Sequence, residues 1–69
     1  MHTPRVIEVT KHADAARNLV AALKTSEGHI CSGYEVYESC ALVWACICEF
    51  GERVTYTYTV RKDGSYTID

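Results

Sequence analysis

The sequence has no long apolar run, no basic run and none of the motifs that mark most enzymes. No stretch approaches the roughly 20 apolar residues that a helix needs to cross a bilayer. The first ten residues lack the apolar core of a signal peptide. The lysines and arginines are scattered, so no polybasic segment indicates attachment to a membrane surface or a phosphate backbone. These absences favour a soluble, cytoplasmic protein with no membrane partner.

Catalytic and cofactor-binding patterns are missing as well. The sequence contains no paired carboxylates, no glycine-rich phosphate loop and no Gly-x-Ser-x-Gly. The three histidines, His2, His12 and His29, have no expected neighbour that would complete a nucleophile–base pair with a cysteine. We expect His12 to be solvated in the first turn of a helix and His29 to lie in a loop. The sequence therefore predicts no enzyme, no catalytic residue and no cofactor.

Composition indicates one small globular domain over residues 1–69. Of the residues, 48% are hydrophobic and 23% are charged, which is typical of a folded chain. Seven lysines and arginines oppose nine aspartates and glutamates, for a net charge of −2. This balance argues against a dedicated binder of the phosphate backbone and against an acidic mimic of DNA.

The first half of the chain predicts a strand followed by a helix. Arg5 to Thr10 is rich in β-branched residues and predicts a strand. Thr10 can cap a helix from Lys11 to Lys24, in which the apolar residues fall on one stripe. Gly28 is the expected terminator of that helix, because glycine accepts a positive φ at little cost.

The second half predicts four strands joined by short turns. Residues 33–38 and the apolar stretch from Ala41 close through Ser39-Cys40, with Val36 opposite Val43. A two-residue hairpin at 50–53, with Gly51 at the first turn position, places Ile47 opposite Tyr56. At 61–65, a two-residue Asp-Gly turn competes with a bulged three-residue turn, which we prefer because it keeps one apolar face whole.

These registers predict a two-layer α+β domain, in which one helix packs on a mostly antiparallel sheet in the order β-α-β-β-β-β. The helix is expected to cover one face of the sheet. That face collects Tyr34, Val36, Val43, Ala45, Ile47, Val54, Tyr56, Tyr58, Val60, Tyr66 and Ile68.

The opposite face carries apolar residues that a single helix cannot cover. Large exposed apolar patches on soluble proteins usually mark interaction sites, and Trp, Tyr and Arg are enriched at binding hot spots. The N-terminal strand, a homodimer mate or a foreign partner are the alternatives for covering it. The candidate partner-binding residues are Tyr37, Leu42, Trp44, Phe50, Arg53, Thr55, Thr57, Thr59 and Arg61.

The four cysteines are predicted to be reduced thiols. The expected register sets Cys31 opposite Cys48, with Cys46 on the same face. A cross-strand disulfide suits that geometry, but a cytoplasmic location disfavours it. Zinc is disfavoured because Cys46-x-Cys48 spreads its sulfurs roughly 6–7 Å apart and no C-x-x-C is present. We therefore assign no metal ligand, and a redox domain built on these thiols remains the least favoured hypothesis.

The layout resembles that of the small phage-encoded anti-CRISPR proteins. The resemblance covers most of the chain and consists of its length, the strand-helix-sheet order and the charged hairpin Lys62-Asp63-Gly64 near the C-terminus. It implies a stoichiometric inhibitor that acts in the host cytoplasm on a nucleoprotein effector, with a CRISPR effector subunit as the protein target. The near-neutral charge departs from the acidic DNA-mimic members of that group.

We therefore predict a non-enzymatic, protein-binding inhibitor that acts through the sheet face around Trp44. One alternative is a small single-stranded nucleic-acid-binding domain, with Arg53 and Arg61 flanking Tyr37 and Trp44. Another is a homodimeric structural protein. Any homodimer is expected to be weak, because the threonine hydroxyls on this face would need partners in a dry interface.

Overall fold

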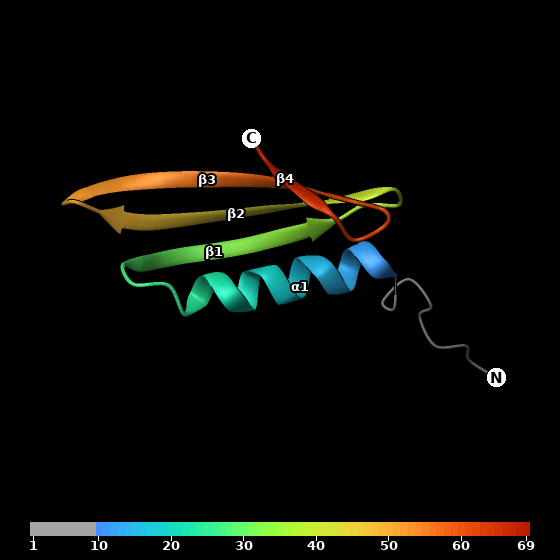
Figure 1. The fold of residues 1–69 in the computed structure, drawn as a ribbon, viewed down its shortest axis with the longest axis horizontal. Helices are drawn as coiled ribbons and strands as arrows, with labels where there is room; N and C mark the ends of the chain where they lie inside the picture. The colour runs from blue at the N-terminus through green and yellow to red at the C-terminus, as the bar shows by residue number, and fades with distance from the viewer. Residues whose placement is uncertain (1–9) are drawn as a thin grey trace.

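The structure, a computed structural model, describes residues 10–69 and contains one helix and four strands (Figure 1). The elements are α1 (Lys11–Lys24), β1 (His29–Val36), β2 (Cys40–Glu49), β3 (Glu52–Arg61) and β4 (Tyr66–Ile68). The strands form one antiparallel sheet in the order β1-β2-β3-β4. This confirms the α+β class, the single helix and the antiparallel sheet. The strand expected over Arg5 to Thr10 lies, apart from Thr10, outside the described residues.

The helix begins and ends at the residues that the sequence predicts. The Thr10 hydroxyl accepts a hydrogen bond from the backbone N–H of Ala13 at 3.3 Å, which satisfies a donor of the first turn. Its buried stripe consists of Ala13, Ala16, Val20 and Leu23, at helical spacing, and the neighbouring His12 is buried as well.

Gly28 does not terminate the helix, contrary to the prediction. Thr25 does so three residues earlier, because its backbone N–H bonds to the carbonyl of Ala22 and its hydroxyl donates to the same oxygen at 2.7 Å. Gly28 instead adopts a φ of +84° in the turn that leads into β1. There its carbonyl accepts the N–H of Cys48 at 2.8 Å and ties the turn to the end of β2.

His12 is buried rather than solvated, which corrects a second expectation. Only 1% of its surface is exposed, and its Nε2 lies 2.6 Å from the carbonyl oxygen of Tyr37. Because a carbonyl can only accept, Nε2 carries the proton and donates. The connection between β1 and β2 therefore folds over the first turn of α1, where a sequence pattern alone predicts solvent.

In the β2–β3 hairpin, each residue of β2 pairs with a residue of β3 two positions away from the predicted partner. Phe50 and Gly51 form the turn, with φ values of 53° and 80°. Ile47 therefore pairs with Val54, and the expected pairing of Ile47 with Tyr56 is wrong. A two-residue shift returns every side chain to the same face, so the assignment of faces is unchanged.

The β1–β2 hairpin shows a similar shift. β1 begins at His29, not at residue 33, and Val36 pairs with Ala41 instead of Val43. The longer connection is closed by the N–H of Tyr37, which donates to the carbonyl of Cys40 at 2.7 Å. A register irregularity between His29 and Cys31 marks a bulge in this edge strand. His29 thus lies in a strand and not in a loop.

The β3–β4 hairpin confirms the preferred bulged turn. Tyr66 pairs with Val60, and Ile68 pairs with Tyr58. Gly64 adopts a φ of +96° and donates its N–H to the carbonyl of Arg61 at 2.9 Å.

The core lies between α1 and the middle of the sheet. The helix packs on β1 and β2 and reaches part of β3, and Figure 1 shows it running alongside β1. Within residues 10–69 it makes no contact with β4, so the sheet extends beyond its cover. The buried strand residues in this cluster are Ala41, Val43, Ala45, Ile47, Tyr58 and Val60.

Four residues predicted for the core are exposed, although they lie on the expected face. Tyr34 and Val36 lie on the edge strand β1, and Tyr66 and Ile68 on the short strand β4. A single helix is too narrow to cover the full width of a four-stranded sheet. No helix among the described residues is long and apolar enough to cross a membrane.

Candidate functional site

The face of the sheet opposite α1 is not covered by any part of residues 10–69, and we call it the open face. It is built from the residues of β2 that alternate with the buried ones, together with their partners on β1 and β3. Three cross-strand rows form its centre: Cys31–Cys46–Thr55, Gly33–Trp44–Thr57 and Glu35–Leu42–Thr59.

Trp44 is the central side chain of the open face. Its indole lies against Gly33 on the neighbouring strand, where a β-carbon would come within 2.5 Å of Cζ2 of Trp44. Glycine in a strand commonly marks such a close approach. Because Gly33 has no side chain, the indole packs directly on the backbone of β1, and 39% of Trp44 remains exposed. The arrangement presents part of the indole to solvent at the centre of the open face.

The threonine row on β3 offers hydroxyl groups beside this indole. Thr55 Oγ1 lies 3.5 Å from the sulfur of Cys46, and Thr59 donates to a carboxylate oxygen of Asp69 at 2.9 Å. Thr57, directly opposite Trp44, makes no side-chain hydrogen bond to any residue of 10–69. Its hydroxyl is therefore available to a ligand at the centre of the face.

Two arginines mark the ends of β3 on the same face. Arg53 pairs with Cys48 and Arg61 with Cys40, and both are exposed. Arg61 also donates to the hydroxyl of Ser65 at 3.1 Å. Positive charge therefore borders an apolar centre.

Tyr37 lies just beyond the end of β1 and contacts the open face through a hydrogen bond to Glu35. Its hydroxyl donates to a carboxylate oxygen of Glu35 at 2.6 Å. This hydrogen bond and the carboxylate charge raise the pKa of Tyr37, which keeps the phenol neutral. The ring is 48% exposed.

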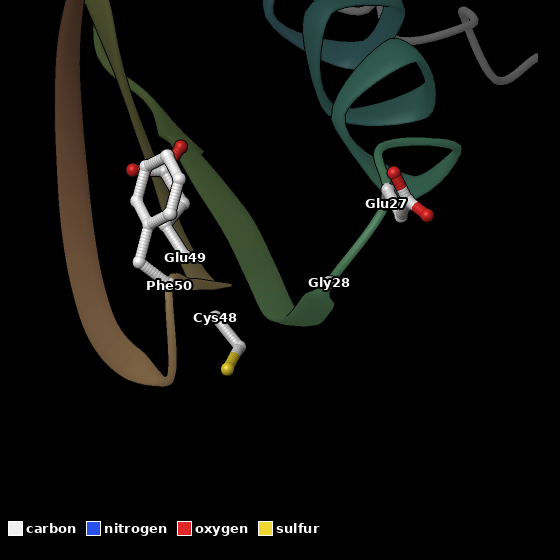
Figure 2. A pocket seen from close by; sticks show the side chains of 5 residues that line it. All are labelled: Glu27, Gly28, Cys48, Glu49 and Phe50. Carbon is white, nitrogen blue, oxygen red and sulfur yellow. The ribbon is translucent and has the colours of Figure 1, made fainter.

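Phe50 does not belong to the open face, which corrects its assignment. It occupies the β2–β3 turn, where its side chain is fully exposed. Figure 2 shows Phe50 and Glu49 on one side of a shallow hollow, with Glu27 on the other side. The other seven candidate residues besides Tyr37, namely Leu42, Trp44, Arg53, Thr55, Thr57, Thr59 and Arg61, lie on the open face as predicted.

The cysteines meet in a different pair from the expected one. Cys31 lies directly opposite Cys46, and the predicted pairing of Cys31 with Cys48 is wrong by two residues. All four cysteines are free thiols. Among the described residues no group of three or more potential metal ligands comes together.

Two contributors to the open face were missed by reading the sequence. The sequence predicts Gly33 only as the start of a strand and assigns no role to Glu35. The signal for Gly33 is a glycine inside a strand next to a strand that carries a tryptophan. The predicted β1–β2 register differs from the observed one by two residues. It places Gly33 opposite Cys46, so it does not predict the contact of Gly33 with Trp44.

Comparisons of the chain with protein-family models, with curated proteins and with solved structures find no match.

Proposed function

We propose that this protein is a small, non-enzymatic inhibitor that binds a partner protein through the open face. The observation that carries the proposal is Trp44, held on Gly33 and exposed at the centre of the face. A tryptophan whose position is already fixed loses little conformational freedom on binding, which favours affinity. Tryptophan is also among the residues that most often dominate the free energy of protein association.

The surroundings of Trp44 favour a protein over a nucleic acid. Leu42 and Cys46 flank the indole along β2, and only Arg53 and Arg61 bring positive charge to the strand ends. Single-stranded nucleic acids are usually held by several stacking aromatics in a basic groove. The whole chain carries a net charge of −2. A partner surface with an apolar centre and carboxylates at its rim fits this arrangement better.

The target class that we propose follows from the resemblance to small phage-encoded anti-CRISPR proteins. An inhibitor of that kind would occupy a surface of a nucleoprotein effector and prevent it from receiving DNA. The open face presents Trp44, packed against Gly33, at its centre, and the proposal requires no catalytic group.

The test compares two aromatic substitutions on opposite faces of the sheet. Trp44→Ala removes the central side chain of the open face, and Tyr66→Ala removes a ring of similar exposure, 49%, on the helix side. The partner is identified by capture on the parent protein, and the dissociation constants of all three proteins are then measured by calorimetry. We expect Trp44→Ala to weaken binding at least about 30-fold, the loss of a hot spot of about 2 kcal/mol, and Tyr66→Ala to leave it unchanged.

Three results would contradict the proposal. Equal affinity of Trp44→Ala and the parent protein would show that the open face is not the docking surface. Salt-dependent binding of mixed single-stranded oligonucleotides that Trp44→Ala abolishes would assign the face to nucleic acid. A dimer that persists on dilution in light scattering, and dissociates in Trp44→Ala, would assign the face to a second copy of the chain.

A further inference from the structure

Cys31 and Cys46 form a cross-strand pair of thiols on the open face. The two residues lie directly opposite each other in the antiparallel β1–β2 ladder. Opposite residues in such ladders have Cα atoms about 4.5–5.5 Å apart, within the range of about 4.4–6.8 Å that a disulfide bridges. The Cys31 side chain is exposed and that of Cys46 is half-buried, so small molecules in solution can reach the pair.

The electrostatic surroundings give the two thiols different roles. Hydrogen bonds from the Thr55 hydroxyl and from the Cys31 thiol lower the pKa of Cys46, and the charge of Arg53 lowers it further. The hydrogen bond to Cys46 raises the pKa of Cys31. Cys46 is therefore the thiol that more readily forms the nucleophilic thiolate, while Cys31 keeps its proton.

The bulge in β1 lies next to this pair. Register shifts between His29 and Cys31, so the strand is already irregular one residue before the thiol. An edge strand with a bulge can adjust its backbone to the S–S bond more easily than a regular central strand. Exposed disulfides are also typically the ones that can be reduced again.

We propose that Cys31 and Cys46 are a reversible dithiol–disulfide site that a low-molecular-weight disulfide such as glutathione disulfide oxidises. The Cys46 thiolate attacks one sulfur of glutathione disulfide, whose S–S bond breaks and releases a glutathione thiolate. Cys31 then loses its proton and attacks the Cys46 sulfur, and the second glutathione leaves as a thiolate. Two protein thiols are oxidised, one disulfide is reduced, and the two protons pass to the two glutathione thiolates.

The experiment equilibrates the purified, reduced protein with defined ratios of reduced and oxidised glutathione and then blocks free thiols with N-ethylmaleimide. Intact mass gives the number of blocked thiols and the loss of two hydrogen atoms in the disulfide form. All four cysteines lie between Lys24 and Arg53, so trypsin leaves them in one peptide. Digestion with chymotrypsin, which cleaves after tyrosine, leucine and tryptophan, separates the segments that contain Cys31, Cys40 and Cys46 with Cys48.

Single serine variants assign the two sulfurs. We expect the parent protein, Cys40→Ser and Cys48→Ser to form the disulfide at the same glutathione ratio. Cys31→Ser should stop at a mixed disulfide between Cys46 and glutathione, because the resolving thiol is gone. Cys46→Ser should form neither product at that ratio. Thermal melts of the reduced variants confirm that each one folds.

The outcome decides between this pair and its neighbours. Loss of the disulfide in Cys48→Ser, with closure retained in Cys46→Ser, would overturn the assignment in favour of the Cys31–Cys48 pair. Accumulation of a mixed disulfide in the parent protein would show that Cys31 does not resolve it. Four blocked thiols at every glutathione ratio would show that the site is not oxidised by disulfide exchange. Binding of the partner is not part of this test, so its result is independent of the proposed function.

Discussion

Replacing Gly28 by alanine should destabilise the fold far more than its position in a surface turn suggests. Gly28 has a φ of +84°, and a β-carbon added there would lie 2.3 Å from the backbone oxygen of Cys48. The left-handed conformation costs an alanine about 1–2 kcal/mol. The carbonyl belongs to a hydrogen-bonded strand and cannot rotate away, so the overlap adds about 1–3 kcal/mol of overpacking.

The expected loss in the free energy of unfolding is thus about 2–5 kcal/mol. A chain of 69 residues has a total stability of about 3–10 kcal/mol. The melting temperature should fall by at least about 8 °C, because 1 kcal/mol corresponds to about 4–8 °C in a domain of this size. Chemical denaturation followed by circular dichroism measures the same loss at 25 °C.

Gly51→Ala provides the matched control. Its φ of +80° is nearly the same, but no atom outside Gly51 and its two chain neighbours lies within 4 Å of the added β-carbon. Only the conformational cost of about 1–2 kcal/mol is expected there. If both variants lose the same free energy, the close approach of Gly28 to Cys48 does not exist and the reasoning from it fails.

Two further predictions concern the other turns. Phe50→Asn should raise the free energy of unfolding by about 1 kcal/mol, because asparagine tolerates the φ of 53° and the fully exposed phenyl ring loses no packing. A fall in stability on urea denaturation would instead show that the ring packs on the domain. Backbone and side-chain hydrogen bonds from Ser65 lower the pKa of Asp63. The charged carboxylate therefore stabilises the turn fully above the ordinary aspartate pKa of about 3.9. This stabilisation is lost as the pH falls through the lowered pKa. Asp63→Ala should therefore have a lower free energy of unfolding than the parent protein at neutral pH. Denaturation curves should show that this difference disappears in acid. A difference that stays constant with pH would rule out the charged carboxylate as its source.

The faces of the sheet could be predicted from the sequence, while the registers could not. Alternation along 53–60 separates the buried Tyr58 and Val60 from Thr57 and Thr59 whatever the pairing. The turn chemistry fixes the pairing, and a phenylalanine at positive φ in the Phe50–Gly51 turn goes against the usual preferences. The error was two residues in both hairpins, which moves a side chain along its face but never to the other one.

Other features depend on contacts between distant segments. The burial of His12 follows from the β1–β2 connection, which lies 25 residues away in sequence. The exact register of β1 and β2 determines that the Trp44 indole packs on Gly33. It also determines that Cys31 pairs with Cys46. The extent of the core depends on how far α1 reaches across the sheet. The local sequence of β4 does not indicate that Tyr66 and Ile68 lie outside the area that α1 covers.

The spatial order of the strands in the described sheet repeats their order along the chain. Every pairing in it can therefore form between neighbours in sequence, without a long loop that must close first. Proteins rich in such local contacts reach the transition state for folding with a small loss of chain entropy and fold quickly. Refolding of this domain should accordingly be a single fast phase, and the β2–β3 hairpin, with the longest run of paired residues, is the natural place for it to start.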